Sequence, residues 1–494
     1  MKKKFYITTS IAYTNASPHL GYALESIQAD VLARHHRLLG EDVFFLTGTD
    51  EHGAKIAQAA KEVGKKPMEF VDEITEEYKL LKKILCLSND DFLRTTDQKR
   101  HWPGVEKIWK LLKKKGDIVK KQYKGLYCIG CEAFLHERDL IEGKCPIHFR
   151  APEMIEEENY FFLLTKYAKI LKKLILENKI KIVPKTRRNE MLGLIKQGLE
   201  DVSFSRIDKT FHWGIPVPGD SSQVLYVWAD ALTNYISALG YGTKKLKLFT
   251  KFWPADVHCV GKDIARFHIL LWPAMLLSAG LKLPKTVFVH GFITVAGQKM
   301  SKSLGNIIDP FELVKKYGSA SSPQVGTDAV RYFLLREIPA TGDGDFTYEK
   351  FEQRYNADLA KGLGNLVARI VTLASKSELP FVKTKTKTRT KSLSPFEDKN
   401  FNKLITQTQK DCKKALDNFK LNEALEAVWG LISFCDRYIE KEKPWEEGKE
   451  KIISDLLVVL KKIAELLIPF LPETSEKILR QIKDKKSEPL FPRI

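Results

Sequence analysis

Two distant stretches of this chain carry residues suited to binding phosphate groups. The first is Pro18-His19-Leu20-Gly21, and the second, far downstream, is Lys299-Met300-Ser301-Lys302-Ser303. The histidine and the two lysines can donate hydrogen bonds to phosphate oxygens, and the lysines add positive charge. Together the two stretches predict a phosphate-handling site built from two halves.

The elements around the first stretch place it at the start of a helix. The run from Phe5 to Ile11 alternates as in a strand, and apolar residues then recur with helical spacing from Leu24 to Leu38, with Gly40 just past the end. The first turn of a helix offers unpaired N–H groups and a positive dipole end, which suits a triphosphate. The histidine can donate to a phosphate oxygen, and the glycine lets a flat base approach the backbone.

The second stretch lies between a predicted strand, 287–290, and a predicted helix. Gly297 and Gly305 flank the lysine loop, and Asp309-Pro310 has the pattern of an N-cap followed by proline, with the helix closing at Gly318. Such a loop can close over phosphates and meet the charge that develops in a transition state. For this stretch taken alone, a solvated Lys/Ser loop is the alternative.

A third cluster has the spacing of metal ligands. Cys128 and Cys131 form one close pair, and Cys145 and His148 form another. Soft ligands in two close pairs can hold Zn²⁺ tetrahedrally, and because the protein supplies all four, the predicted site is structural. Unrelated buried thiols are the alternative. The other cysteines, Cys86, Cys259, Cys412 and Cys435, are predicted to pack in cores.

The two phosphate stretches resemble the signature sequences of class I aminoacyl-tRNA synthetases. Further blocks resemble one family among these enzymes, the methionyl-tRNA synthetases, and they occur in family order at 48–53 (GTDEHG), 226–231 (YVWADA), 261–268 (GKDIARFH) and 290–306. One position departs from the pattern, because Tyr22 stands where the first signature ends in histidine. A phenol can donate a hydrogen bond but cannot carry a positive charge.

The resemblance implies a methionine–tRNA ligase that uses ATP, with Mg²⁺ on the phosphates, and then tRNA(Met). A carboxylate is already nucleophilic at neutral pH, so catalysis would rest on alignment and charge stabilisation, with His19, Lys299 and Lys302 as the catalytic residues. The ATP-binding positions of the family correspond to His19, Gly21, Tyr22, Asp263, Lys299, Ser301 and Lys302. Its methionine-binding positions correspond to Ile11, Tyr13, Asp50, Trp228, Ala231, Leu232, Tyr235, Ile264, Phe267 and His268.

The chemistry of these positions suits methionine. A carboxylate at Asp50 can hold the substrate ammonium group, and aromatic rings can surround a polarizable thioether. Leu232 stands where a relative has proline. Without the resemblance, Trp228, Tyr235 and Phe267 would each be predicted as core aromatics.

Composition agrees with an RNA partner and excludes several other classes. The chain of 494 residues carries a formal net charge of +19, which favours a polyanionic partner. No signal peptide or membrane-length apolar span is visible, so we expect a cytoplasmic protein. The sequence has no Walker A motif and no G-x-G-x-x-G opening a βαβ unit, so a kinase or a dehydrogenase lacks its main support.

The predicted fold is α/β: a Rossmann-like parallel-sheet catalytic domain split by an insertion with a zinc knuckle, followed by an α-helical anticodon-binding bundle. The predicted boundaries are 1–116 and 211–306 for the two catalytic halves, 117–210 for the insertion, 307–350 for a connecting segment and 351–494 for the bundle. Val224-Leu225-Tyr226-Val227 and Val257-His258-Cys259-Val260 are predicted as strands of the resumed sheet.

Within the bundle, Asn365, Arg369 and Trp445 match the anticodon-reading residues of the family. Asn365 and Arg369 are one turn apart, and Trp445 could stack on a splayed base; packing roles are the alternative. The alternating Lys/Thr stretch 383–391 is predicted as a flexible loop. No appended dimerising module is visible, so we expect a monomer. Rival functions are a class I synthetase for another apolar amino acid and a synthetase-like RNA-binding protein that has lost catalysis.

Overall fold

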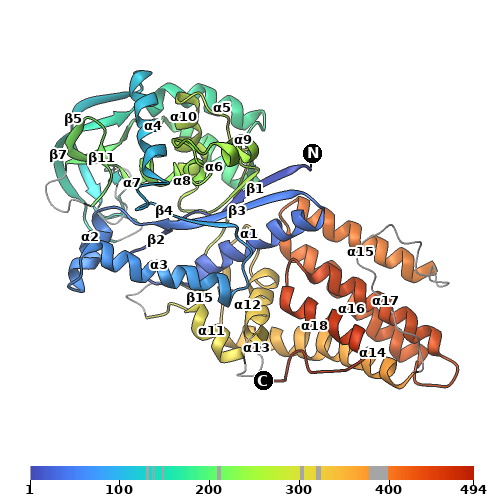
Figure 1. Cartoon of the computed structure of the whole chain (residues 1–494). Helices are drawn as coiled ribbons and strands as arrows, with labels where there is room; N and C mark the ends of the chain where they lie inside the picture. Colours follow the sequence, from blue (N-terminus) through green and yellow to red (C-terminus); the bar gives the residue numbers. More distant parts are fainter. Residues whose placement is uncertain are drawn as a thin grey trace. The chain divides into compact units, whose positions relative to one another are not determined.

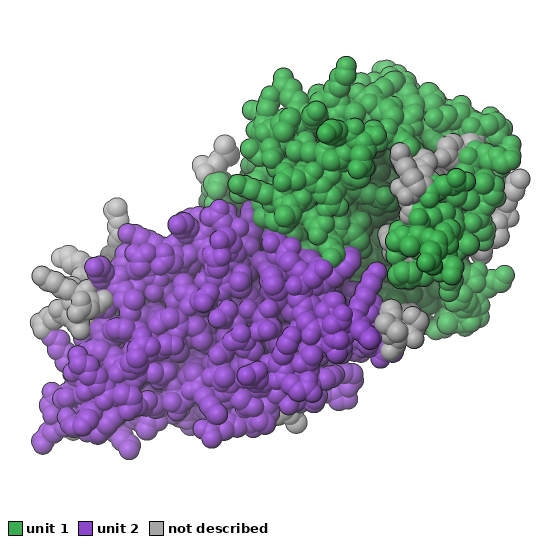
Figure 2. All heavy atoms as spheres, turned by 180° about the vertical axis from the view of Figure 1, so that it is seen from behind, with its two compact units in different colours: residues 1–18, 39–80, 88–290 green, residues 19–38, 81–87, 291–494 purple. Residues whose placement is uncertain are grey.

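The computed structural model describes residues 2–128, 133–135, 137, 140–146, 149–207, 213–300, 305–318, 324–377 and 399–494. This part of the chain divides into two compact units, coloured separately in Figure 2. Unit 1 comprises Met1–Pro18, Leu39–Leu80 and Ser88–His290, and unit 2 comprises His19–Leu38, Leu81–Leu87 and Gly291–Ile494. The Lys/Thr stretch 383–391 lies outside the described residues.

Unit 1 is built on a seven-stranded sheet in which every pairing is parallel, in the order β2-β3-β1-β13-β14-β8, with β4 also paired to β3. Figure 1 labels β1 to β4 of this sheet. Its strands are β1 (Lys4–Thr8), β2 (Ala12–Tyr13), β3 (Asp42–Asp50), β4 (Asp91–Arg94), β8 (Lys181–Val183), β13 (Val257–Gly261) and β14 (Thr286–His290). Every residue of β13 and β14 is buried, as expected for parallel strands covered on both faces. The predicted strands 287–290 and 257–260 are thus confirmed.

The parallel arrangement brings the carboxyl ends of the strands to one edge of the sheet, where α/β folds bind ligands. Thr8, Asp50, Gly261 and His290 are the last residues of their strands. The segment after β1 follows this edge: Ser10 N–H donates to the Cys259 carbonyl (3.0 Å), and Thr14 N–H donates to that of Asp50 (3.0 Å).

Two smaller sheets in unit 1 are antiparallel. One has the order β6-β5-β7-β9, with β5 (Ile118–Cys128), β6 (Ala133–Leu135), β7 (Glu153–Phe162) and β9 (Val202–Ser203). The other has the order β10-β12-β11, with β10 (Ser205–Ile207), β11 (Pro216–Val217) and β12 (Asp220–Leu225).

The prediction that 224–227 forms a strand of the main sheet was wrong. Val224 pairs antiparallel with Arg206 and Pro216, and Val227 already begins a helix. An apolar run indicates a strand but not its partner, which depends on the neighbouring chain. Conversely β8, inside the predicted insertion, pairs with β14 of the parallel sheet.

Helices surround these sheets in unit 1. They are α2 (Ala54–Glu62), α4 (Trp102–Lys114), the 3₁₀ turn η2 (Leu164–Tyr167), α5 (Ala168–Leu176), α6 (Lys185–Gln197), α7 (Val227–Ala231), α8 (Asn234–Ser237), α9 (Lys247–Phe252), the π-helical segment η3 (Phe267–Leu271) and α10 (Trp272–Ser278); α3 (Pro67–Ile84) runs from unit 1 into unit 2. The apolar faces of the helices from α4 to α10 contribute to one extended core that contains the fully buried Trp272. The core thus supports the ends of strands and helices that carry the candidate site.

Unit 2 is mainly helical. It holds α1 (Leu20–Leu38), a small sheet of β15 (Ile293–Val295), β16 (Gln298–Lys299) and β17 (Gly344–Phe346), and then α11 (Pro310–Tyr317), α12 (Gln324–Arg336), α13 (Tyr348–Arg354), the π-helical η5 (Tyr355–Gly364), α14 (Asn365–Lys376), α15 (Lys399–Asp417), α16 (Leu421–Glu442), α17 (Glu450–Leu467) and α18 (Pro472–Asp484). The helices predicted after His19 and Asp309 are confirmed, and the Asp309 side chain accepts from Phe311 N–H (2.7 Å) as an N-cap. No described helix has both the length and the apolar character needed to cross a membrane.

Candidate active site

The acidic candidate for amino-acid binding, Asp50, ends β3 at the ligand-binding edge of the sheet. Tyr13 pairs with it directly across β2 and β3, so the two residues are neighbours by register. Asp50 is 8% exposed, and Tyr13 and Ile11 are half-buried. The sheet therefore presents a carboxylate beside an aromatic ring.

An aromatic wall gathers the candidates that follow β12 and β13. Trp228 stacks on Phe267, with ring centroids 3.9 Å apart and planes inclined by 9°, and His268 stands edge-on to Trp228 at 6.0 Å. Trp228, Phe267, Ile264 and Tyr13 are only partly buried and rest on the core that contains Leu232 and Tyr235. Partial exposure leaves the rings of Trp228 and Phe267 accessible to a ligand, whereas Tyr235, at 1% exposed, is part of the core.

Hydrogen bonds fix the ring of His268 and the tautomer that it adopts. Its Nδ1 lies 3.0 Å from the Ile264 carbonyl, which can only accept, so Nδ1 carries a proton. In the neutral imidazole Nε2 then accepts from the Tyr235 hydroxyl at 2.7 Å. Both groups are almost fully buried, and the backbone of Tyr235 is itself held, because the Tyr6 hydroxyl donates to its carbonyl (2.7 Å).

Two local features shape this wall. Phe267 and His268 open the π-helical segment η3, a rare geometry that often marks functional sites. His258 lies under Tyr235, with ring centroids 4.2 Å apart. Burial, with a smaller contribution from His268, holds the pKa of His258 well below its usual range, so this imidazole stays neutral.

Asp263, a candidate ATP contact, is exposed just beyond the end of β13. Its carboxylate lies over Gly261, where a Cβ atom would sit only 2.8 Å from Asp263 Oδ1. A side chain at Gly261 would therefore displace this carboxylate.

The described parts of the two predicted phosphate-binding stretches, 19–21 and 299–300, lie in unit 2, and the structure brings them together there. The side chain of Met300 reaches within 3.8 Å of the position that a Cβ of Gly21 would take, and Leu20 N–H donates to the Ile308 carbonyl (3.1 Å). Lys299 is exposed at the end of a hairpin whose turn, Ala296-Gly297, has positive φ at both residues. Ser301 and Lys302 lie outside the described residues.

The ring of His19 has a defined tautomer. Its Nδ1 accepts from Gly21 N–H at 3.0 Å, so in the neutral imidazole the proton is on Nε2. A Cβ at Gly21 would lie 2.9 Å from this ring, which explains why glycine is needed here. Tyr22 follows on the first turn of α1 and is half-buried.

The four predicted zinc ligands are only partly within the described residues. Cys128, at the end of β5, and Cys145 are buried thiols outside any disulfide, and Cys145 opens a tight turn in which Phe149 N–H donates to its carbonyl (2.8 Å). Cys131 and His148 lie outside the described residues. Among the residues that are described, no three His, Cys, Asp or Glu side chains gather around a possible metal position.

The candidate anticodon residues occupy one end of α14 and the segment after α16. Asn365 is exposed at the first position of α14, and Trp445 is 54% exposed. Arg369, one turn along α14, forms an ion pair with Glu440 of α16 (2.7 Å).

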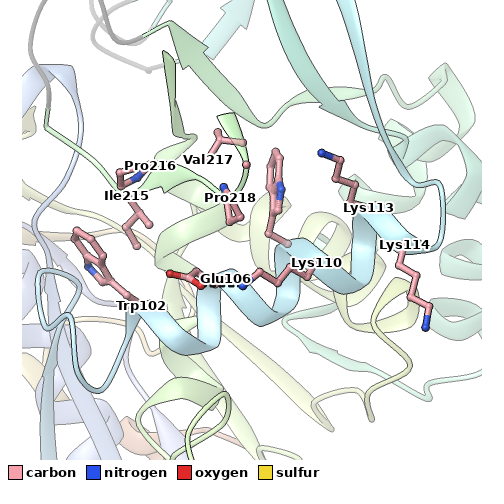
Figure 3. A pocket seen from close by; sticks show the side chains of 11 residues that line it. Trp102, Glu106, Lys110, Lys113, Lys114, Ile215, Pro216, Val217 and Pro218 are labelled. Carbon is pink, nitrogen blue, oxygen red and sulfur yellow. Dashed lines mark hydrogen bonds and ion pairs between the residues drawn. The ribbon is translucent and has the colours of Figure 1, made fainter. Parts of the chain in front are cut away.

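Sequence reasoning missed a groove of about 690 Å³ along α4 (Figure 3). Pro216, Val217 and Pro218 form its wall facing the helix, from which Lys113 and Lys114 project. Trp109 also lines it and is almost fully buried, and its indole N–H has no hydrogen-bond partner among the described residues. The helical spacing of lysines on α4 was visible in the sequence, but its partner segment was not.

Comparisons with known proteins agree with this geometry. The family model described as tRNA synthetases class I (M) matches residues 5–150 and 139–371, and that of the anticodon-binding domain of tRNA ligase matches 398–492. The methionine–tRNA ligase of Thermotoga maritima is 44% identical, covering 97% of this chain and 75% of its own length, and that of Brucella suis is 40% identical, covering 99% and 95%.

A solved structure agrees over the same range. Mycobacterium tuberculosis methionyl-tRNA synthetase in complex with methionyl-adenylate superposes with a TM-score of 0.90 at 35% identity, covering 99% of this chain and 100% of that one. The match spans the parallel sheet, the signature stretches and the helical bundle. The chain therefore belongs to the methionyl-tRNA synthetases, a family of class I aminoacyl-tRNA ligases.

Proposed function

We propose that this synthetase binds the amino acid with Asp50 and the aromatic wall, and that the two signature stretches contact the triphosphate. The methionine carboxylate attacks the α-phosphorus of ATP, the bond to the bridging oxygen breaks, and pyrophosphate leaves. A hydroxyl of the 3′-terminal ribose of tRNA(Met) then attacks the carbonyl carbon of the adenylate, and AMP leaves. The solved relative that holds methionyl-adenylate supports this order.

The aromatic wall of unit 1 is the observation that carries the proposal. Asp50 would bind the substrate ammonium group, and the stacked Trp228 and Phe267 would cover the side chain. The Tyr235 hydroxyl donates its hydrogen bond to His268 Nε2. Its oxygen can therefore only accept hydrogen bonds from other groups. Ile11, Tyr13, Ala231, Leu232 and Ile264 would complete the apolar lining.

In unit 2, the expected unpaired N–H groups at the start of α1 are not found, because Leu20 N–H donates to the Ile308 carbonyl and Gly21 N–H donates to His19 Nδ1. The start of the helix would therefore act on phosphate oxygens through its positive dipole end. His19 Nε2 would donate to the same phosphates, and Lys299, Ser301 and Lys302 would meet the charge that develops on the leaving pyrophosphate. Gly21 and Tyr22 complete this set, and Asp263 of unit 1 would contact the ribose. Mg²⁺ accompanies ATP and screens its charge.

Replacing Tyr235 tests the amino-acid half of the proposal. Tyr235→Phe leaves the buried His268 Nε2 without its donor, so we expect the KM for methionine in ATP–pyrophosphate exchange to rise about tenfold. The KM for ATP should change little. Tyr241→Phe, at another buried tyrosine of unit 1, is the control. Equal KM values for methionine in the two variants would reject the assignment.

We also propose that Cys128, Cys131, Cys145 and His148 hold a structural zinc ion. The buried side chains of Cys128 and Cys145 suit a soft metal. The cysteines would bind it as thiolates and His148 through its imidazole. Metal analysis of the purified protein should find one zinc per chain, and Cys145→Ser should lose it together with thermal stability. A metal-free wild-type protein with full activity would refute the site.

For tRNA recognition, we propose that Asn365, Arg369 and Trp445 contact the anticodon. The exposure of Asn365 and Trp445 supports this role, and Trp445 lies within the range 398–492 that matches the anticodon-binding family. Arg369 would have to exchange part of its ion pair with Glu440 for an RNA contact. A monomer is proposed for the assembly, which sedimentation of the purified chain would test.

A further inference from the structure

Two of the family blocks contain buried polar residues that the reaction described above does not use. His52 follows Asp50 by two residues, on the loop after β3, and Asp230 follows Trp228 by two residues, at the end of α7. The side chains are 4% and 1% exposed. Both side chains are shielded from solvent. Buried polar groups need partners within the protein, so the two residues have a structural or functional role.

The carboxylate of Asp230 joins these residues to a third element. His52 Nδ1 donates to its Oδ2 at 2.6 Å, and His101 Nε2 donates to its Oδ1 at 2.6 Å. His101 is fully buried just before α4, and its Nδ1 lies 2.7 Å from Ser237 Oγ on α8. Three segments of unit 1 therefore meet at one carboxylate, and His101 links a fourth, α8, to it.

The positions of these residues relative to the amino-acid pocket repeat a pattern. Asp50 precedes His52 by two residues, Trp228 precedes Asp230 by two, and Tyr235 precedes Ser237 by two. Each segment thus gives one side chain to the predicted methionine site and another to the buried cluster. A shift within the cluster would move a pocket residue on the same rigid segment.

The negative charge of Asp230 holds the residues of the cluster in place. Burial alone would raise the pKa of Asp230, but the charge of His52 and the hydrogen bonds from both imidazoles outweigh burial and hold the pKa below its ordinary value. A buried ionised carboxylate is costly to leave unpaired, so both histidines are kept in place.

Glu51, which lies between Asp50 and His52, is also held in place by hydrogen bonds. Glu51 is fully buried, and its Oε1 accepts from Thr49 Oγ1 (2.6 Å), Thr75 Oγ1 (2.7 Å) and Arg94 Nε (2.7 Å). Trp213 Nε1 donates to the Glu51 carbonyl (2.6 Å), and its ring stands edge-on to His52. Asp50 therefore directly precedes two anchored residues, Glu51 and His52.

We propose that Asp230 is a positioning residue that, through His52 and His101, sets the spacing of Asp50, Trp228 and Tyr235 for binding the ammonium group and side chain of methionine. The inference rests on the proposed function of these three residues. It assigns to the cluster an effect on methionine binding in particular, because the signature stretches that contact ATP lie in unit 2.

The test compares two substitutions of His52 by ATP–pyrophosphate exchange. His52→Leu removes the donor to Asp230, and we expect the KM for methionine to rise about tenfold or more, with the KM for ATP unchanged. In His52→Asn the amide nitrogen takes nearly the place of Nδ1 and can still donate, so the KM for methionine should stay within about threefold of wild type. If His52→Leu yields no folded protein, Asp230→Asn, which keeps the shape of the carboxylate, replaces it in the comparison.

Asp117→Asn is the matched control for loss of a buried aspartate. Asp117 is 3% exposed in unit 1 and is held by the hydroxyls of Tyr167 and Ser278 (2.5 and 2.7 Å), which adjoin none of the predicted methionine residues in sequence. The Asp117→Asn substitution should lower the melting temperature and leave the KM for methionine unchanged.

Three results would overturn the inference: an unchanged KM for methionine in His52→Leu, an equal rise in His52→Asn, or an equal rise in Asp117→Asn. Wild-type protein without methionine-dependent exchange would instead contradict the proposed function itself. The two failures are therefore distinguishable.

Discussion

Tyr22 is the residue at which this chain departs from the first signature of its family. It lies on the first turn of α1, next to His19 and Gly21, and its N–H donates to the His19 carbonyl (3.0 Å). Since a phenol is neutral, positive charge for the phosphates must come from the helix dipole and from the lysines of the second signature. The phenol can still contribute one hydrogen bond.

Two substitutions of Tyr22 separate these contributions. Tyr22→Phe should lower the kcat of ATP–pyrophosphate exchange about tenfold by removing a donor to a charged oxygen, and the KM for methionine should not change. Tyr22→His, which restores a donor, should exchange at least as fast as wild type. A Phe variant at the wild-type rate would show that the hydroxyl has no part in the reaction.

At the scale of residues, motifs pointed to the candidate residues but not to the contacts that support them. Asp50, Trp228 and His19 stand in recognisable blocks, so the sequence identified them. His101 has no motif, and its contact with Asp230 joins positions 129 residues apart. Such a contact arises from tertiary packing of α4 against α7 and α8, which no local spacing encodes.

At the scale of elements, α12 connects α1 with the end of the bundle inside unit 2. Arg331 of α12 is fully buried; it pairs with Asp30 of α1 (2.8 Å) and donates to the carbonyls of Pro469 (2.9 Å) and Phe470 (2.7 Å), just before α18. Asp328, also on α12, accepts from Thr474 N–H (2.6 Å). The helix that begins with the first signature is thus held to the start of α18.

Glu473 makes this connection sensitive to pH. Burial, and then the negative charge of Asp328, raise the pKa of Glu473 from 4.5 to about 7. The folded protein therefore binds more protons than the unfolded chain between these values, so this group's stabilisation is complete below pH 4.5 and is lost as pH rises through about 7.

Glu473→Gln tests this dependence by differential scanning calorimetry. The melting temperatures of variant and wild type should be similar near pH 5, and the variant should melt higher near pH 8, because it carries no buried charge there. A difference that stays constant with pH would show that Glu473 titrates normally.

The elements themselves were predicted unevenly. The helix from Leu20 to Leu38 and the capped helix after Asp309 follow from spacing and end signals, which are local properties. The partner of β12 and the π-helical geometry of η3 and η5 could not be predicted, since both depend on packing against other segments.

At the scale of the whole molecule, the formal net charge of +19 and the anticodon-binding family match indicate an RNA partner. The described part of the bundle exposes Trp445 directly after α16, beyond Lys443, whose left-handed backbone ends the helix. An exposed indole at a helix end can stack on an unpaired base.

Trp445→Ala should therefore weaken tRNA binding without affecting adenylate formation. Loss of one stacked base predicts a rise of about tenfold in the KM for tRNA(Met), while methionine-dependent exchange stays at the wild-type rate. Tyr348→Ala, at another exposed ring of unit 2, serves as the control. A loss of both activities in Trp445→Ala would assign the residue to folding.

The central claim is that the aromatic wall selects methionine for activation by ATP. ATP–pyrophosphate exchange by the purified chain, measured with methionine, leucine, isoleucine, valine and cysteine in turn, tests it most directly. We predict rapid exchange with methionine and, at equal concentration, slower exchange with each of the others. Exchange supported best by another amino acid, or by none while the folded chain still binds tRNA, would contradict the claim.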